Sequence, residues 1–160
     1  MLRYTMKRSG RDRFSPLNSI WLISIIKLIN HFNVRNIFFK KNRLSGMIDF
    51  YFAANDYFMY EIAICVNALC FDKRASKFFL NKKKVKNLIK GYESVKKVSV
   101  KEKKSLNILC RGAAMRYFLT RLFDYSNTPK SALIKIKDPR EYYQKLVIHN
   151  NLKTYKDYLN

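Results

Sequence analysis

The feature that most constrains the fold is the density of apolar residues between Tyr57 and Phe71. A helix on a protein surface is usually apolar along one stripe only, whereas apolar side chains occupy most positions of this segment. Helical spacing links five of them, which are Met59, Ile62, Ala63, Val66 and Cys70. The segment therefore predicts a helix that is buried on most sides, and the rest of the chain has to cover it.

Upstream of this helix, two short apolar runs at 37–39 and 44–51 predict a β-hairpin over about 36–51. The four polar residues 40–43 separate the runs, as expected of a hairpin turn. We expect this hairpin to pack on the helices that follow it.

Downstream, the pattern is helical throughout. Residues 73–98 mix apolar residues with many lysines and predict two short amphipathic helices, ending near Gly91, whose lysines face solvent. Ser99 and Glu102 form a capping-box pattern that opens a long helix to about Tyr125. Its predicted buried face consists of Leu106, Leu109, Ala113, Tyr117, Leu119 and Phe123.

A last helix is predicted from Asp138-Pro139 to about His149, because proline suits the first helical position. The fold class is therefore α+β and mainly α, with one β-hairpin followed by a helical bundle. We expect a basic, poorly ordered arm over 1–28, a folded unit over 29–150 and a tail over 151–160.

The charge is strongly unbalanced, since 33 lysines and arginines face 11 carboxylates and give a net charge of +22. Such a charge suggests nucleic acid or an anionic membrane as a partner. The excess peaks at 73–104, where tyrosine and phenylalanine are interleaved with lysine, so a basic helical module that binds nucleic acid non-specifically is one hypothesis. The abundance of Lys, Asn, Ile, Phe and Tyr is equally typical of AT-rich genes. No specific nucleic-acid motif is present.

The cysteines and histidines predict no metal chemistry. Cys65, Cys70 and Cys110 have no CxxC spacing and lie in apolar runs, which is typical of buried thiols in a reducing compartment. His31 and His149 are the only histidines, too few for a His-based zinc site. The apolar run from 20 to 29 is interrupted by a lysine and is too short to span a bilayer. We expect a cytoplasmic chain that does not use a membrane.

The hairpin carries the residues that suggest chemistry. Asn36 stands immediately before the first strand, and Asp49 lies within the apolar stretch 46–50. A carboxylate among apolar residues is costly unless it binds a cation or accepts several hydrogen bonds, and capping a turn is the alternative role. Asn and Asp oxygens are also hard ligands of the kind that hold Mg²⁺ against nucleotide phosphates.

Several long blocks make the sequence similar to a known family. They are Ser45-Gly-Met-Ile-Asp-Phe-Tyr-Phe-Ala-Ala-Asn-Asp56, Tyr60-Glu-Ile-Ala-Ile-Cys-Val-Asn-Ala-Leu-Cys-Phe71, Arg111-Gly-Ala-Ala-Met-Arg-Tyr-Phe-Leu-Thr-Arg-Leu-Phe-Asp124, Asn127-Thr-Pro129 and Lys137-Asp-Pro-Arg-Glu-Tyr142. Over roughly residues 29–149 they resemble the bacterial homoserine kinases of the aminoglycoside and choline kinase-like superfamily.

The resemblance implies a protein-kinase-like fold that transfers the γ-phosphate of ATP to the hydroxyl of L-homoserine, in threonine biosynthesis. It implies ATP and Mg²⁺ as cofactors, with Asn36 and Asp49 at the metal-binding positions of the family. Asp56 and Glu61 are candidates to receive the ammonium group of the amino acid, although Asp56 could instead cap the helix that follows.

The sequence also departs from the family pattern. The catalytic loop of the family reads H-x-D-x-x-x-x-N, but an ungapped count back from Asn36 puts His31 where the catalytic Asp belongs, and a gapped alignment supplies no Asp either. No Gly-rich strand-turn precedes the hairpin. The sequence thus resembles the C-terminal lobe of a kinase, and we expect no retained catalytic residue. Activity would require a partner chain that supplies the N-terminal lobe.

Overall fold

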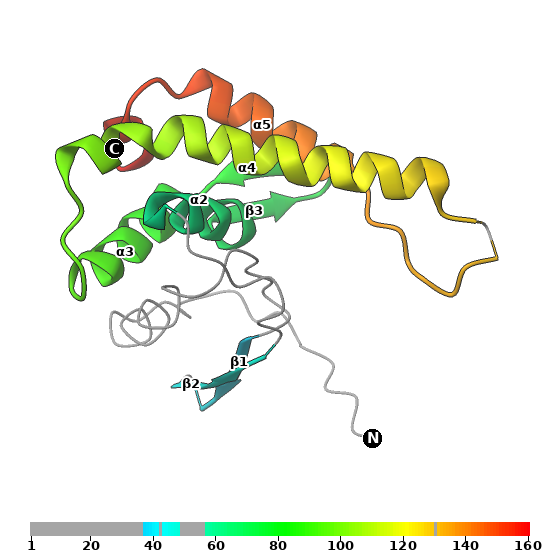
Figure 1. The fold of residues 1–160 in the computed structure, drawn as a ribbon, viewed down its shortest axis with the longest axis horizontal. Coiled ribbons are helices and arrows are strands. Elements are labelled where there is room, and N and C mark those ends of the chain that lie inside the picture. The colour runs from blue at the N-terminus through cyan, green and yellow to red at the C-terminus, as the bar shows by residue number, and fades with distance from the viewer. Residues whose placement is uncertain (1–36, 42, 49–56, 130) are drawn as a thin grey trace.

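The computed structural model describes residues 37–41, 43–48, 57–129 and 131–160. In chain order these residues form β1 (Ile37–Lys40), β2 (Arg43–Met47), α2 (Phe58–Leu69), β3 (Phe71–Arg74), β4 (Lys77–Leu80), α3 (Lys82–Glu93), α4 (Val100–Asn127), α5 (Arg140–Asn151) and the 3-10 helix η2 (Tyr155–Tyr158). Figure 1 shows α4 running the length of the helical body, with α5 along one side and α2, α3 and β3 along the other. The expected fold, mainly α with an antiparallel hairpin, is confirmed.

Helix α2 is buried on almost every side, as its composition predicts. Its five consecutive residues 62–66 are completely buried, and α4, α3, η2 and the partly buried ends of α2 itself supply the cover. The core reaches from α2 to Leu106 and Cys110 of α4 and to Tyr158 of η2. The last ten residues, expected only as a tail, therefore contribute a side chain to the core. All three cysteines are free and buried.

The first hairpin lies where the sequence predicts it. Strands β1 and β2 are antiparallel, and Phe38 pairs with Gly46 while Phe39 pairs with Leu44, so Ser45 is the extra residue of a β-bulge. Figure 1 shows this hairpin standing apart from the helices, so the expected packing on the bundle is not observed between the residues that the structure describes. The predicted second strand extended to Tyr51, but residues 49–56 lie outside the described residues.

The prediction of two helices in 73–98 is wrong for the first of them, because residues 71–80 form a second antiparallel hairpin, β3–β4. Phe78 and Leu80 are partly buried while Phe79 between them is exposed, which is strand alternation. Gln144 of α5 fixes the hairpin, accepting from the Phe78 N–H at 3.2 Å and donating to the Ser76 carbonyl at 3.1 Å. A single helix, α3, follows, and its buried face is Val85, Leu88, Ile89 and Tyr92.

Helix α4 begins as expected and differs from expectation at its far end. The Ser99 hydroxyl accepts from the Glu102 N–H and the Glu102 carboxylate accepts from the Ser99 N–H, which completes the capping box. Leu106 and Ala113 are buried as predicted. Leu119 and Phe123 are exposed, so their predicted burial is wrong. The 3.6-residue repeat turns Leu119 away from Leu106, and Phe123 lies near the C-terminal end of α4.

We predict that Ala75→Gly stabilises the protein. Ala75 occupies the turn between β3 and β4 with φ of 51°, in the left-handed region, where a Cβ costs roughly 1 kcal/mol that glycine does not pay. Part of this gain is offset by the greater freedom of glycine in the unfolded chain. Urea unfolding should show an increase of up to about 1 kcal/mol in the free energy of unfolding.

The matched control is Ser76→Gly, because Ser76 is the other residue of the same turn and is not among the described residues with positive φ. This variant should be neutral or slightly destabilising. Equal effects of the two glycines would contradict the explanation by backbone strain.

Candidate functional site

Most of the residues singled out from the sequence lie outside the described residues. This is true of His31, Asn36, Asp49 and Asp56, so their predicted roles are not tested by the structure. Glu61 is described, in the first turn of α2, and is buried. Burial raises the pKa of the Cys65 thiol, and the nearby Glu61 carboxylate raises it further. The Glu61 carboxyl group is thus buried, one helical turn from Cys65.

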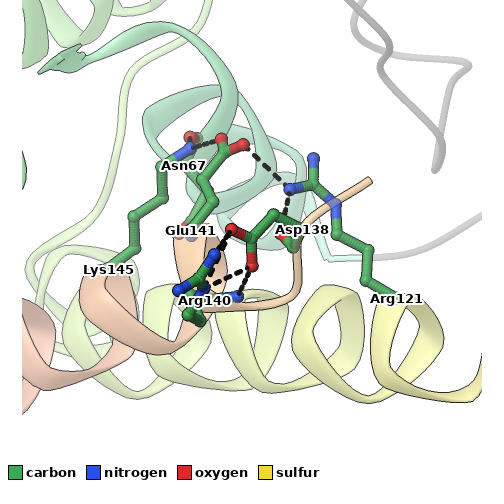
Figure 2. Close-up of polar contacts among 6 residues, drawn as sticks. All are labelled: Asn67, Arg121, Asp138, Arg140, Glu141 and Lys145. Atoms are coloured by element: carbon green, nitrogen blue, oxygen red, sulfur yellow. Dashed lines mark hydrogen bonds and ion pairs between the residues drawn. The ribbon is translucent and has the colours of Figure 1, made fainter. Parts of the chain in front are cut away.

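A charged cluster among the described residues joins α2, α4 and α5, and it centres on Glu141. Lys145 Nζ lies 2.7 Å from Glu141 Oε1, and Arg121 Nη1 lies 2.8 Å from Glu141 Oε2. Figure 2 shows the two cations approaching the carboxylate from different sides. The pKa of Glu141 is lowered, because the two cations outweigh the opposing effect of its burial. One carboxylate thus serves two cations that come from different helices.

Lys145 also closes the end of α2. Its side chain is 3% exposed, and Nζ donates to the backbone carbonyl of Asn67 at 2.8 Å. The last turn of α2 contains no basic residue of its own, so this ammonium group supplies the positive charge that a helix C-terminus favours. Burial lowers the pKa of Lys145, and Glu141 opposes that shift. The ammonium group thereby links the end of α2 to α5.

A second network, which is uncharged, extends from the side chain of Asn67. The Asn67 amide nitrogen donates to the carbonyls of Ala63 and Cys110, both at 3.0 Å. Its oxygen lies 3.2 Å from Nε2 of His149, and Nδ1 of His149 lies 2.9 Å from the Tyr158 hydroxyl. Because the amide oxygen can only accept, Nε2 carries the proton and Nδ1 accepts from Tyr158. This chain of bonds connects α2, α4, α5 and η2.

The beginning of α5 is fixed by Asp138, as its start signal predicts. Asp138 Oδ1 accepts from the backbone N–H of Arg140 at 2.9 Å, and the Arg140 side chain pairs with the same carboxylate. Arg121 also donates to the Asp138 carbonyl at 3.2 Å. The long helix α4 therefore holds both the first turn of α5 and the Glu141 carboxylate within it.

The geometry of this cluster favours a structural role. Its carboxylate is paired with two cations, its lysine is buried, and His149 is hydrogen-bonded through both nitrogens. The described residues contain no group of three or more His, Cys, Asp or Glu side chains that could hold a metal ion. Among the same residues no helix is long and apolar enough to cross a membrane. The cluster positions α2 and α5 relative to α4.

Reasoning from the sequence did not assign these roles. Arg121 and Glu141 lie in blocks that carry the family resemblance. Lys145 and His149 come after the block that contains Glu141, at helical spacing from it. A charged residue four positions from an opposite charge on a helix is a visible signal. The contacts with Asn67, 78 and 82 residues away, have no signature in a single sequence.

Comparisons with known proteins agree with one another. The phosphotransferase enzyme family matches residues 30–93. Homoserine kinases of Acidiphilium cryptum, Sinorhizobium fredii and Agrobacterium fabrum are 46%, 48% and 46% identical to this chain over 123 residues. The match covers 77% of this chain and 38%, 37% and 37% of those relatives. The chain thus spans less than two fifths of the length of the relatives it matches.

We predict that Glu141→Gln destabilises the fold, because it leaves the buried Lys145 ammonium without its counter-charge. Breaking a fully buried pair costs about 3–5 kcal/mol. The Glu141 side chain is 30% exposed, so we expect a smaller loss of about 2 kcal/mol in the free energy of unfolding. The matched control is Asp138→Asn, since its partner Arg140 is 82% exposed and such a pair contributes below about 1 kcal/mol. A loss no larger than that of the control would refute the proposed role of Glu141.

We further predict an acid-sensitive stability that depends on His149. Burial, with the nearby Lys145 charge, lowers the pKa of His149 from 6.5 to about 4. In the unfolded chain His149 is protonated below pH 6.5, whereas in the folded chain it is protonated only below about pH 4. The stability of the fold therefore falls as the pH drops through this window. Between pH 7 and pH 5 the expected loss is about 2 kcal/mol.

Urea unfolding at the two pH values measures this loss, and His149→Gln should remove it. Titration of the imidazole by NMR gives the pKa directly. A His149 pKa close to 6.5 in the folded protein would contradict the prediction.

Proposed function

We propose that this chain, which is similar to one part of the homoserine kinases, provides the metal-binding and helical portion of a kinase for L-homoserine. The identity of 46–48% over 123 residues carries this proposal. The matched family segment at 30–93 includes the hairpin and all of α2. The reaction would move the γ-phosphate of ATP to the homoserine hydroxyl.

In this proposal Asn36 and Asp49 would hold a Mg²⁺ ion, which would supply positive charge to the nucleotide phosphates. Both offer the hard oxygen ligands that Mg²⁺ prefers, and they flank the hairpin β1–β2 in the sequence. A metal ion at this place would neutralise the charge that develops on the phosphate oxygens during phosphoryl transfer. Asp56 and Glu61 are proposed to receive the ammonium group of the amino acid.

We also propose that the chain is inactive by itself. The catalytic-loop position of the substrate-deprotonating Asp corresponds to His31, and the 160 residues contain no Gly-rich phosphate-binding turn. Phosphoryl transfer depends almost entirely on positioning and on charge stabilisation. Activity then requires a nucleotide-binding lobe and a base from outside these 160 residues.

The alternative of non-specific nucleic-acid binding gains no support from the aromatic side chains of the lysine-rich stretch. Tyr92 is buried in the core, and so are Val85, Leu88 and Ile89 beside it. Phe79 is exposed, but one ring does not make a stacking platform for successive bases. The exposed lysines of α3 then leave only a salt-sensitive attraction to phosphates.

We predict that the purified chain shows no homoserine-dependent formation of ADP in the presence of Mg²⁺. Loss of an oriented general base alone costs about 10²–10⁴ in rate. The measurement is a coupled assay with and without homoserine, repeated with Asp49→Ala. Turnover that survives this substitution would come from a contaminant, whereas turnover that it abolishes would contradict the proposed inactivity.

The same assay tests the family assignment when it includes the portion of Sinorhizobium fredii homoserine kinase that lies outside the match. Homoserine-dependent turnover that appears on mixing, and that needs Asn36 and Asp49, would support the proposal. Turnover that is indifferent to both residues would exclude them as metal ligands.

A further inference from the structure

Helix α4 carries a second apolar face that no described element covers. We call Ile108, Met115, Leu119, Leu122 and Phe123 the outer stripe, and each is between 40% and 68% exposed. Their spacing of seven, four, three and one residues keeps them on one side of the helix. The buried residues Leu106, Cys110 and Ala113 lie on the opposite side. The outer stripe is thus continuous over about 22 Å of helix, at 1.5 Å per residue.

Gly112 lies within the outer stripe and leaves it open. A Cβ built at Gly112 would meet nothing within 4 Å, so no neighbour in the described structure requires a glycine there. Glycine is unfavourable inside a helix, and its usual benefit is the close approach of another backbone. The position therefore suits a second helix packed directly against α4.

The charges on the same face define what that helix must offer. Lys101, Lys104 and Arg111 lie on the side of the outer stripe, by the 3.6-residue repeat, and are exposed. None of the three takes part in the ion pairs between described residues. The only carboxylates in α4 are Glu102, which caps the helix, and Asp124, which lies on the core side of the repeat. The face thus combines apolar residues with unpaired cations.

A second copy of the chain fits this face poorly. The outer stripe carries no carboxylate that could pair with the lysines of another copy, and each copy has a net charge of +22. Like charges brought together at an interface oppose association.

We propose that the outer stripe of α4 docks an amphipathic helix of a partner protein, whose apolar seam covers the stripe and whose flanking carboxylates pair with Lys101, Lys104 and Arg111. This mode of recognition reads apolar anchors at helical spacing. It concerns a surface on the far side of α4 from the core, and it does not depend on the phosphotransferase proposal.

The test uses a synthetic amphipathic peptide with leucines three and four residues apart and glutamates at the flanking positions. One comparison peptide has the same composition in scrambled order, and another has lysine in place of glutamate. Fluorescence anisotropy at near-physiological salt measures the affinity of each peptide for the full chain. We expect the glutamate peptide to bind at least tenfold more tightly than either comparison peptide.

The variants locate the binding surface. Leu119→Gln combined with Leu122→Gln should reduce the affinity at least tenfold, without adding any charge. Val147→Gln is the matched control, because Val147 is an apolar residue of α5 with 42% exposure, and it should bind as the unaltered chain does. Circular dichroism checks that the variants keep their helix content.

Three results would overturn the proposal. Equal affinity for the scrambled peptide would show a general attraction to acidic chains, and absence of binding would show that the stripe docks no such helix. Self-association of the chain in sedimentation, removed by the double substitution at Leu119 and Leu122, would assign the stripe to a second copy.

Discussion

Burial of α2 is the constraint on which the other described elements depend. A helix whose residues 62–66 are fully buried has no face left for solvent, so it must be covered from several directions at once. Helix α4 lies along one side, α3 lies along another, and η2 contributes Tyr158 from the end of the chain. Covering one apolar helix thereby determines where most of the later elements lie.

The ends of a buried helix create a polar cost, because the last carbonyls have no partner within the helix. In this structure, residues that are distant in sequence supply hydrogen-bond partners at the end of α2. Lys145 donates to the Asn67 carbonyl, and the Asn67 side chain is bonded to α4 and to His149. These bonds fix the rotation and depth of α5 against α2, which apolar contacts alone would leave less specific. Apolar burial and polar satisfaction thus act on the same helix.

The sequence was sufficient wherever local signals and burial agreed. The apolar density of α2, the capping box at Ser99 and the start of α5 just after Asp138 each have a local physical cause, and each is observed. The hairpin β3–β4 was missed because its turn contains Ala75 in place of glycine or asparagine, and because Gln144 supports it from 66 residues away. The exposure of Leu119 was missed because its apolar character alone does not show whether it lies on the buried face or on the exposed face of α4. The metal-ligand candidates Asn36 and Asp49 remain predictions.

The reactivity of the three buried cysteines reports how often the core opens. Burial raises the pKa of all three thiols, that of Cys70 to about 12, and only the thiolate reacts with a thiol-specific reagent, because the thiolate is the nucleophile. The thiols are therefore modified only when the core opens and their pKa returns to its ordinary value. Cys65 belongs to α2, Cys70 ends it, and Cys110 belongs to α4. A common labelling rate at the three positions would mean that α2 and α4 separate in one cooperative event, whereas a faster rate at Cys70 would identify the end of α2 as the first part to open.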